Sequence, residues 1–162
     1  MPPVPGVPLG FGRQSSTPEP EPCPCGGAAY GTCCGPLISG EQLVVTAEQL
    51  MRSRYSAFAL GASDPEAIEH LLRTHPETGQ TAAARRKALK DSCRNIQWLS
   101  LKVLDCQNGR VIDKYGTVTF EARWRDRDRR EGVLRECSRF GRGKSGEWLY
   151  LEALRLGDEP AG

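Results

Sequence analysis

The fold of this chain is indicated by one stretch, GTVTFEARW at positions 116–124, in which small or apolar residues alternate with polar ones. Successive side chains of a β-strand point to opposite faces, so every second residue shares a face. The expected core-facing set is Gly116, Val118, Phe120, Ala122 and Trp124. The stretch therefore predicts a strand with one face buried and the other in solvent.

A strand-like segment with the same alternation precedes this stretch. Its apolar positions are Leu99, Leu101 and Val103, and Asn108-Gly109 then supplies a dipeptide typical of tight turns. We expect this segment to pair with residues 116–124 as a hairpin.

Two more strand-like segments follow. The first should place Leu134, Glu136, Ser138 and Phe140 on one face, and the second covers residues 148–153. Consecutive strands joined by short turns predict an antiparallel meander over the C-terminal half of the chain.

Helical patterns occupy the region before the strands. A capping box at Thr46 begins the first helix, and Gly61 provides its stop. The second has Asp64 as N-cap and must finish before His75-Pro76.

The third helix should run from Thr81 to about Cys93, with Ala83, Ala84 and Leu89 facing inward. Helices followed by a run of antiparallel strands define an α+β fold, in which about three helices pack on one face of a curved sheet. Such a sheet can wrap into a cone that encloses a pocket.

The N-terminal part of the chain divides into two segments of unusual composition. Residues 1–22 are rich in proline, which predicts a disordered, extended leader. Residues 23–40 are rich in glycine and cysteine, and residues 44–156 form the α+β domain. The chain thus combines a leader, a small knuckle and one domain.

Composition excludes several classes of protein. A formal charge of +2 does not indicate a particular binding partner. The sequence contains no run of about 18 apolar residues, the length needed to span a membrane. Seven cysteines, an odd number, argue against a disulfide framework and for a reducing compartment. We therefore expect a cytoplasmic protein, although the leader leaves organelle targeting open. The sequence makes no prediction of the oligomeric state.

Four cysteines gather in the knuckle, as Cys23, Cys25, Cys33 and Cys34. Four thiolates are the ligand set of a closed tetrahedral Zn²⁺ site, and soft sulfur ligands exclude Ca²⁺ and Mg²⁺. The segment also lacks an apolar core that would fold it without metal. We predict a structural zinc site, and the alternative is a group of free or redox-active thiols.

These motifs resemble those of a known family. Residues 23–35 look like the SEC-C motif, a small zinc knuckle, and residues 51–58, MRSRYSAF, resemble the signature of the bacterial YchJ family. The resemblance continues in order through Thr74-His75-Pro76, Trp98-Leu99-Ser100-Leu101, Gly116-Thr117-Val118, Glu136-Cys137-Ser138-Arg139-Phe140 and Trp148-Leu149-Tyr150.

This resemblance implies a fold but no reaction. In the YchJ family a SEC-C motif precedes a nuclear-transport-factor-2-like (NTF2-like) domain, whose cone-shaped sheet is closed by helices. Enzymes, ligand sensors and catalytically silent proteins all use that scaffold, so function has to be argued from side chains.

Glu136 is the candidate catalytic residue of the cone. It shares its strand face with Leu134 and Phe140, which would place a carboxylate on the apolar, concave side, where general acid or base work becomes feasible. The structural alternative is an ion pair with Arg54 or Arg52, and we expect bidentate geometry from Arg54.

The predicted pocket contains Arg54, Tyr55, His75, Glu136, Ser138 and Trp148. His75 is expected to cap the C-terminal carbonyls of the second helix, or alternatively to point into the mouth of the cone. Ser138 has no nucleophile elbow around it, so it does not predict a hydrolase.

Three classes of function follow from these residues. The favoured one is a zinc protein whose cone binds a small-molecule ligand or a protein partner. The second is a small enzyme of isomerase, dehydratase or hydrolase type that uses Glu136 as acid or base. A nucleic-acid binder is the weakest, because Asp126 and Asp128 interrupt the basic run at positions 123–130.

Overall fold

The three long helices begin where their capping residues predict. A computed structural model, which describes residues 17–160, contains helices α2 (Ala47–Leu60), α3 (Pro65–Arg73) and α4 (Ala82–Asn95). The side chains of Thr46, Asp64 and Thr81 each accept a hydrogen bond from a backbone N–H of the first turn. These contacts satisfy donors that a helix N-terminus leaves unpaired. Positions 1–16 of the expected leader lie outside the described residues.

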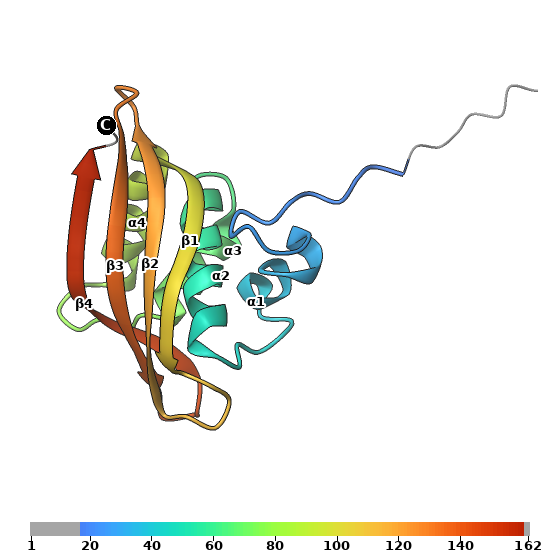
Figure 1. Ribbon diagram of the computed structural model, residues 1–162, viewed down its shortest axis with the longest axis vertical. Coiled ribbons are helices and arrows are strands. Elements are labelled where there is room, and N and C mark those ends of the chain that lie inside the picture. The colour runs from blue at the N-terminus through green and yellow to red at the C-terminus, as the bar shows by residue number, and fades with distance from the viewer. Residues whose placement is uncertain (1–16, 161–162) are drawn as a thin grey trace, which may run out of the picture.

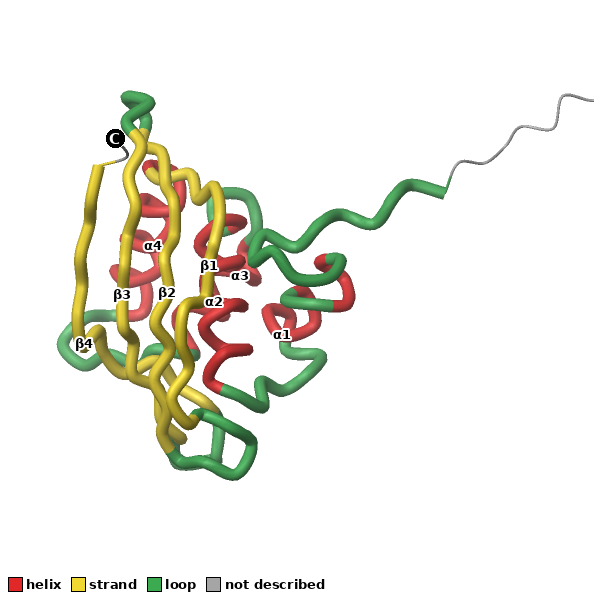
Figure 2. The backbone as a smooth tube through the Cα atoms, in the orientation of Figure 1, coloured by secondary structure: helices red, strands yellow, loops and turns green. Residues whose placement is uncertain are grey.

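Within residues 17–160 the strands form one antiparallel sheet in the order β1-β2-β3-β4. The strands are β1 (Ile96–Asn108), β2 (Tyr115–Asp126), β3 (Glu131–Arg142) and β4 (Trp148–Pro160). Figure 1 shows the curved strands side by side, with the helices on one face of the sheet. The same layers are visible in Figure 2, where the helices are red and the strands yellow. The α+β meander is therefore confirmed.

The register of β2 and β3 agrees with the alternation in the sequence. Val118 and Phe120 are buried and lie opposite Ser138 and Glu136, respectively, and Ala122 lies opposite Leu134. The face that the sequence predicts as apolar is thus the concave face, against which the helices pack.

The predicted alternation in β1 is correct for Leu101 and Val103 and wrong for Leu99. A register shift between Trp98 and Ser100 leaves Leu99 in a bulge. Trp98, Leu101 and Val103 consequently pack against the core, whereas the sequence assigned Leu99 to that face. A bulge inserts one unpaired residue and so reverses the faces on its two sides.

Helix α4 also differs from expectation, because Ala83 and Ala84 are exposed. Leu89 and Cys93, farther along the helix, make its contact with the apolar cluster around Ile68. Alanine carries little apolar surface, so its position in the helical pattern says little about which face is buried.

The cysteine segment packs on the domain as part of one core. It contains a 3₁₀ turn, η1 (Tyr30–Thr32), and a short helix, α1 (Gly35–Ser39). Cys25 and Cys34 are each 1% exposed and belong to the same buried cluster as Leu50 and Tyr55 of α2. The knuckle and the α+β domain therefore share apolar contacts. Among residues 17–160, no helix has the length and apolar character needed to cross a membrane.

The junction of α2, α3 and α4 yields the first prediction. A methyl group added at Gly61 would come within 2.5 Å of Cys93 Sγ and 2.9 Å of Ile68 Cδ1, whereas Gly157 has open space around it. We expect Gly61→Ala to lower the free energy of unfolding by about 1–3 kcal/mol, as overpacking does. Chemical denaturation measures this, with Gly157→Ala as the control. Equal stability of the two variants would contradict the packing described.

Candidate functional site

The four cysteines of the knuckle meet at one point. The sulfur atoms of Cys23, Cys25, Cys33 and Cys34 all lie within 4.8 Å of one another, and those of Cys25 and Cys33 are 3.6 Å apart. Ligands about 2.3 Å from a tetrahedral Zn²⁺ would be roughly 3.8 Å from one another. The donor set and its spacing thus fit a metal ion with little movement. The cysteine cluster is compatible with metal binding.

The thiols of this cluster are not equivalent. A hydrogen bond from the Cys34 thiol lowers the pKa of Cys25 to about 4, against the effect of burial, while the same contact raises the pKa of Cys34. Burial and the neighbouring sulfurs raise the pKa of Cys33 to about 11. Of Cys25, Cys33 and Cys34, Cys25 is therefore the thiol that loses its proton most readily.

Helix α2 holds the cluster from one side. The Arg52 guanidinium donates to the carbonyl oxygen of Cys25 at 3.2 Å, and the Ser56 hydroxyl lies 3.6 Å from Cys23 Sγ. Arg52 and Ser56 are four residues apart, so they lie on the same face of the helix. The YchJ-like signature at residues 51–58 therefore includes the surface on which the knuckle docks.

A buried histidine that sequence analysis did not single out connects the knuckle to the helices. Arg73 donates to His70 Nδ1 at 2.9 Å and to the carbonyl oxygens of Leu37 and Ile38 in α1. Because Nδ1 accepts, Nε2 carries the proton and donates to Ser53 Oγ at 2.8 Å. Burial, together with the charge of Arg73, lowers the pKa of His70 to about 3. The imidazole is thus a neutral structural link.

A cavity of about 420 Å³ lies between α2, α4 and the concave face of the sheet. Its walls bring together five of the six residues that the sequence assigns to a pocket. They are Arg54, Tyr55, His75, Glu136 and Ser138, joined by further aromatic and apolar side chains from Phe58, Trp98, Phe120, Leu134, Phe140 and Tyr150. The cavity is therefore largely apolar, with a few convergent polar groups, as small-molecule sites are.

Glu136 lies in this cavity, but its partner is not the predicted one. Its Oε1 atom accepts a hydrogen bond from Ser138 Oγ at 2.5 Å and a second from Tyr150 Oη at 3.1 Å. Within the described residues, neither Arg54 nor Arg52 forms an ion pair with it. The expected bidentate pair is wrong because hydroxyl groups of β3 and β4 reach the carboxylate first.

Arg54 instead ties α2 to the end of α3. Its Nη1 donates to the carbonyl oxygen of Leu71 at 3.0 Å and to Thr74 Oγ1 at 2.7 Å. The guanidinium carbon Cζ lies over the ring of Tyr150, 4.9 Å from its centre, and over that of Phe58, 5.9 Å from its centre. Burial lowers the pKa of Arg54 to about 10, so the group stays protonated at neutral pH.

His75 stands at the mouth of the cavity. Its Nδ1 lies 3.0 Å from the carbonyl oxygen of Tyr150, and its Nε2 lies 3.0 Å from Glu77 Oε1. The side chain of Thr74, not that of His75, caps α3 by donating to the carbonyl of His70. His75 therefore lines the cavity, and its side chain makes its hydrogen bonds to Tyr150 and Glu77 and not to the end of α3.

Trp148 does not join this site. Its indole N–H donates to the carbonyl oxygen of Val45 at 3.0 Å, and the Arg142 guanidinium lies 4.1 Å from its ring centre. It contributes to a different hollow between the knuckle and the β3–β4 hairpin. Trp148 pairs with Arg142 at the start of β4, whereas Tyr150 pairs with Phe140 farther along the strand and lines the cavity.

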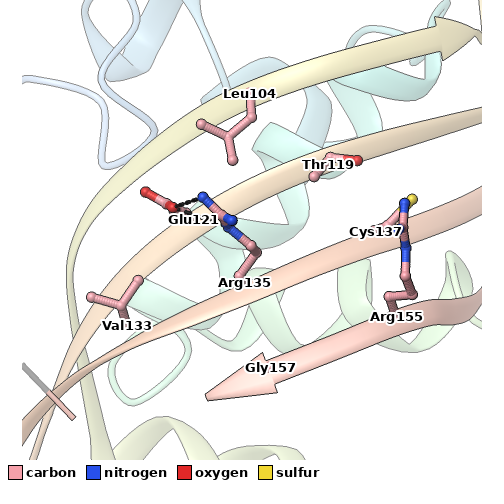
Figure 3. A pocket seen from close by; sticks show the side chains of 8 residues that line it. All are labelled: Leu104, Thr119, Glu121, Val133, Arg135, Cys137, Arg155 and Gly157. Atoms are coloured by element: carbon pink, nitrogen blue, oxygen red, sulfur yellow. Dashed lines mark hydrogen bonds and ion pairs between the residues drawn. The ribbon is translucent and has the colours of Figure 1, made fainter. Parts of the chain in front are cut away.

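The opposite face of the sheet carries a groove of about 460 Å³. Figure 3 shows its side chains, among them Glu121 and Arg135, which form an ion pair with each other. Most of its lining residues are exposed or half-buried, and its acidic residue is already paired. The charged pair Glu121–Arg135 is thus already satisfied within the groove.

The basic run at positions 123–130 lies at the β2–β3 hairpin. Arg125 and Arg123 pair with Glu131, and Arg130 pairs with Asp126 and Asp128. Much of the positive charge is thus neutralised locally, which gives a nucleic-acid interface no support.

Known proteins share both the fold and the cysteine knuckle of this chain. Residues 46–153 match the family described as the YchJ middle NTF2-like domain. A solution structure of a SEC-C motif containing protein from Rhodopseudomonas palustris is similar, with a TM-score of 0.67 and 27% identity, over 85% of this chain and 100% of that one. The fold and the cysteine cluster together define an NTF2-like α+β protein with a SEC-C-like knuckle.

Relatives of known sequence identify the family. A UPF0225 protein of Sodalis glossinidius is 42% identical over 138 residues, covering 83% of this chain and 84% of the relative. A UPF0225 protein of Streptomyces coelicolor is 41% identical over 133 residues, which cover 81% of this chain and 93% of the relative. The chain belongs to the YchJ family, also called UPF0225.

The neutral state of His70 predicts how the stability of the fold depends on pH. Unfolded histidine takes up a proton near pH 6.5, whereas the folded residue does so only near pH 3. Stability should therefore fall as the pH drops below about 6.5, and the loss at pH 4.5 should be about 2–3 kcal/mol. Denaturation of the wild-type protein and of His70→Gln across this range tests it. The variant should lose this component of the slope, and parallel profiles would refute the assignment.

Proposed function

We propose that this protein is a zinc-stabilised binding protein whose concave cavity takes a small ligand. The observation that carries the proposal is that two oppositely charged side chains, Arg54 and Glu136, face one apolar cavity without pairing with each other. Charged groups that are half-buried in a protein ordinarily pair, because leaving them apart costs free energy. Two such groups kept apart are suited to contacts with a third molecule.

Zinc is the proposed metal of the cysteine cluster. All four donors are sulfur, their separations suit a tetrahedron, and three of them are buried. The metal would hold the knuckle on α2, since Cys25 and Cys23 contact Arg52 and Ser56 of that helix. The SEC-C motif of the R. palustris protein supports the same assignment.

Catalysis by Glu136 is the second candidate. Its Oε1 accepts two hydrogen bonds, whereas Oε2 has no hydrogen-bond partner within residues 17–160, so a substrate proton would have access to it. This alternative predicts turnover of a cavity ligand that Glu136→Gln abolishes while binding persists. Binding without turnover is the primary proposal, because neither histidine offers a second acid–base group next to Glu136: His70 is buried elsewhere, and His75 contacts Glu77 and Tyr150.

Metal analysis tests the zinc assignment. The purified wild-type protein should contain about one zinc ion per chain, as structural sites do. Cys34→Ser should lose most of the metal and melt at a lower temperature, because the knuckle shares its core with α2. Cys106→Ser, a change outside the cluster, should keep both properties. A metal-free wild-type protein with a fully ordered knuckle would rule zinc out.

Filling the cavity tests ligand binding. Leu134 lines the cavity, whereas its neighbour Val133 lines the groove on the opposite face. The fluorescent aromatic anion 1-anilinonaphthalene-8-sulfonate should bind the wild-type protein, and Leu134→Trp should weaken this binding about tenfold or more by occupying the space. Val133→Trp is the matched control, and far-ultraviolet circular dichroism checks the fold of both. The proposal fails if the dye does not bind the wild-type protein, or if Val133→Trp weakens dye binding more than Leu134→Trp does.

A further inference from the structure

The chemistry of the ligand follows from the hydrogen-bonding atoms that the cavity leaves free. On Arg54, Nη1 makes both protein contacts, and within residues 17–160 no residue accepts from Nε or Nη2. On Glu136, Oε1 accepts both protein contacts and Oε2 accepts none from the described residues. No described side-chain nitrogen or oxygen is both buried and unpartnered. The free atoms of these two residues are therefore not sealed from solvent, and both residues line the cavity, Arg54 lining the adjoining recess of about 180 Å³ as well.

The free atoms of Arg54 form one edge of the guanidinium. Its Cζ atom lies over the rings of Tyr150 and Phe58, and its Nη1 is held by Leu71 and Thr74. Nε and Nη2 together present two parallel N–H groups, the geometry that matches the two oxygens of a carboxylate. The edge is thus preorganised for a bidentate contact, since its partner residues already fix the plane of the group.

Arg54 requires a carboxylate in the ligand, and Glu136 sets a second requirement for the ligand's charge. A ligand with only a carboxylate would bring a second negative charge into a cavity that already holds Glu136, at a cost in an apolar setting. A ligand that also carries an amino group would place a cation at Oε2 and cancel that cost. At the adjoining recess of about 180 Å³, Glu77 and Arg85 pair with each other at 3.5 Å, so they leave the charge balance unchanged.

The walls set the third requirement. Rings of Tyr55, Trp98 and Phe120 and the side chain of Leu134 line the same space. Aromatic walls favour a planar or apolar ligand body through area burial and edge-to-face contacts. A cavity of about 420 Å³ also limits the ligand to a single small molecule.

We infer that the cavity binds a small aromatic amino acid or a close analogue, with its carboxylate on the Nε–Nη2 edge of Arg54 and its ammonium group on Oε2 of Glu136. This inference rests on the proposed binding function and specifies its ligand class. In this arrangement the aromatic side chain of the ligand lies among Tyr55, Trp98 and Phe120. Arg54 and Glu136 act together, because each charged end of the ligand meets the opposite charge.

A set of four probes that share one phenyl ring tests each requirement separately. They are L-phenylalanine, 3-phenylpropanoate, 2-phenylethylamine and 3-phenylpropanamide, and isothermal titration calorimetry measures their dissociation constants. L-phenylalanine should bind about tenfold or more tightly than each of the others, since only it makes both charge-assisted contacts. Tighter binding of 3-phenylpropanoate or of 3-phenylpropanamide would overturn the inference, the first by excluding Glu136 from recognition and the second by showing a neutral head group.

Glu136→Gln supplies the decisive variant. The amide keeps the shape and the hydrogen bonds of Oε1 but loses the negative charge. L-phenylalanine should lose about tenfold in affinity and 3-phenylpropanoate should gain, so that their order reverses. Glu121→Gln, in the ion pair on the opposite face, is the matched control and should preserve the wild-type order. An unchanged order in Glu136→Gln would contradict the inference.

The outcomes also separate this inference from the proposed function. If 1-anilinonaphthalene-8-sulfonate occupies the cavity while none of the four phenyl probes binds, the ligand class is wrong and the binding function stands. If the dye does not bind either, both fail. Arg54→Lys adds an independent check, since it keeps the charge but removes the two-pronged edge. It should weaken the two carboxylate probes and leave 2-phenylethylamine unaffected, provided its melting temperature shows a folded protein.

Discussion

The packing of helix α2 between two different environments is the constraint on which the rest of the structure depends. Arg52 and Ser56 contact the cysteine cluster, and Arg54 and Tyr55, which lie between them in the sequence, line the cavity. A rotation of α2 by one residue would break both sets of contacts at once. The arrangement explains why four cysteines and a ligand-sized cavity occur in one small chain: the knuckle fixes the helix that forms a wall of the cavity.

The energetic character of the cavity follows from what its charges do. Arg54 makes two hydrogen bonds with its protein neighbours and lies over the rings of Tyr150 and Phe58, and Glu136 receives two hydroxyl hydrogen bonds. Each charge is stabilised where it stands, so neither has to move to the other. A fixed guanidinium and a fixed carboxylate lose little entropy when a ligand arrives, which is the usual basis of affinity in a preformed site. The separation of the two groups is therefore a property of the fold.

Much of this architecture could be predicted from the sequence, because it depends on local patterns. The capping residues Thr46, Asp64 and Thr81 mark the helix starts, and strict alternation sets the faces of β2 and β3. The four cysteines identify the cluster by composition alone. The inward position of Glu136 follows from the same alternation, since β3 remains regular up to Cys137.

The remaining features depend on contacts between distant segments, which carry no local signal. The bulge at Leu99 reverses the faces of β1, and its position is set by pairing with β2. Glu136 accepts a hydrogen bond from Tyr150, which lies opposite Phe140 on the neighbouring strand β4, so this contact depends on the pairing of β3 with β4. His70 stands in an ordinary amphipathic helix, and its role becomes visible only with Ser53 and Arg73 on either side.

The central claim is that the free edge of Arg54 faces a ligand site, and the nuclear magnetic resonance signal of its Nε–Hε group tests this most directly. On titration with L-phenylalanine, the account predicts that the Arg54 Nε–Hε cross-peak shifts and becomes protected from exchange with water, while that of Arg52, on the knuckle side of the same helix, stays in place. An unchanged Arg54 signal under saturating L-phenylalanine would contradict the account.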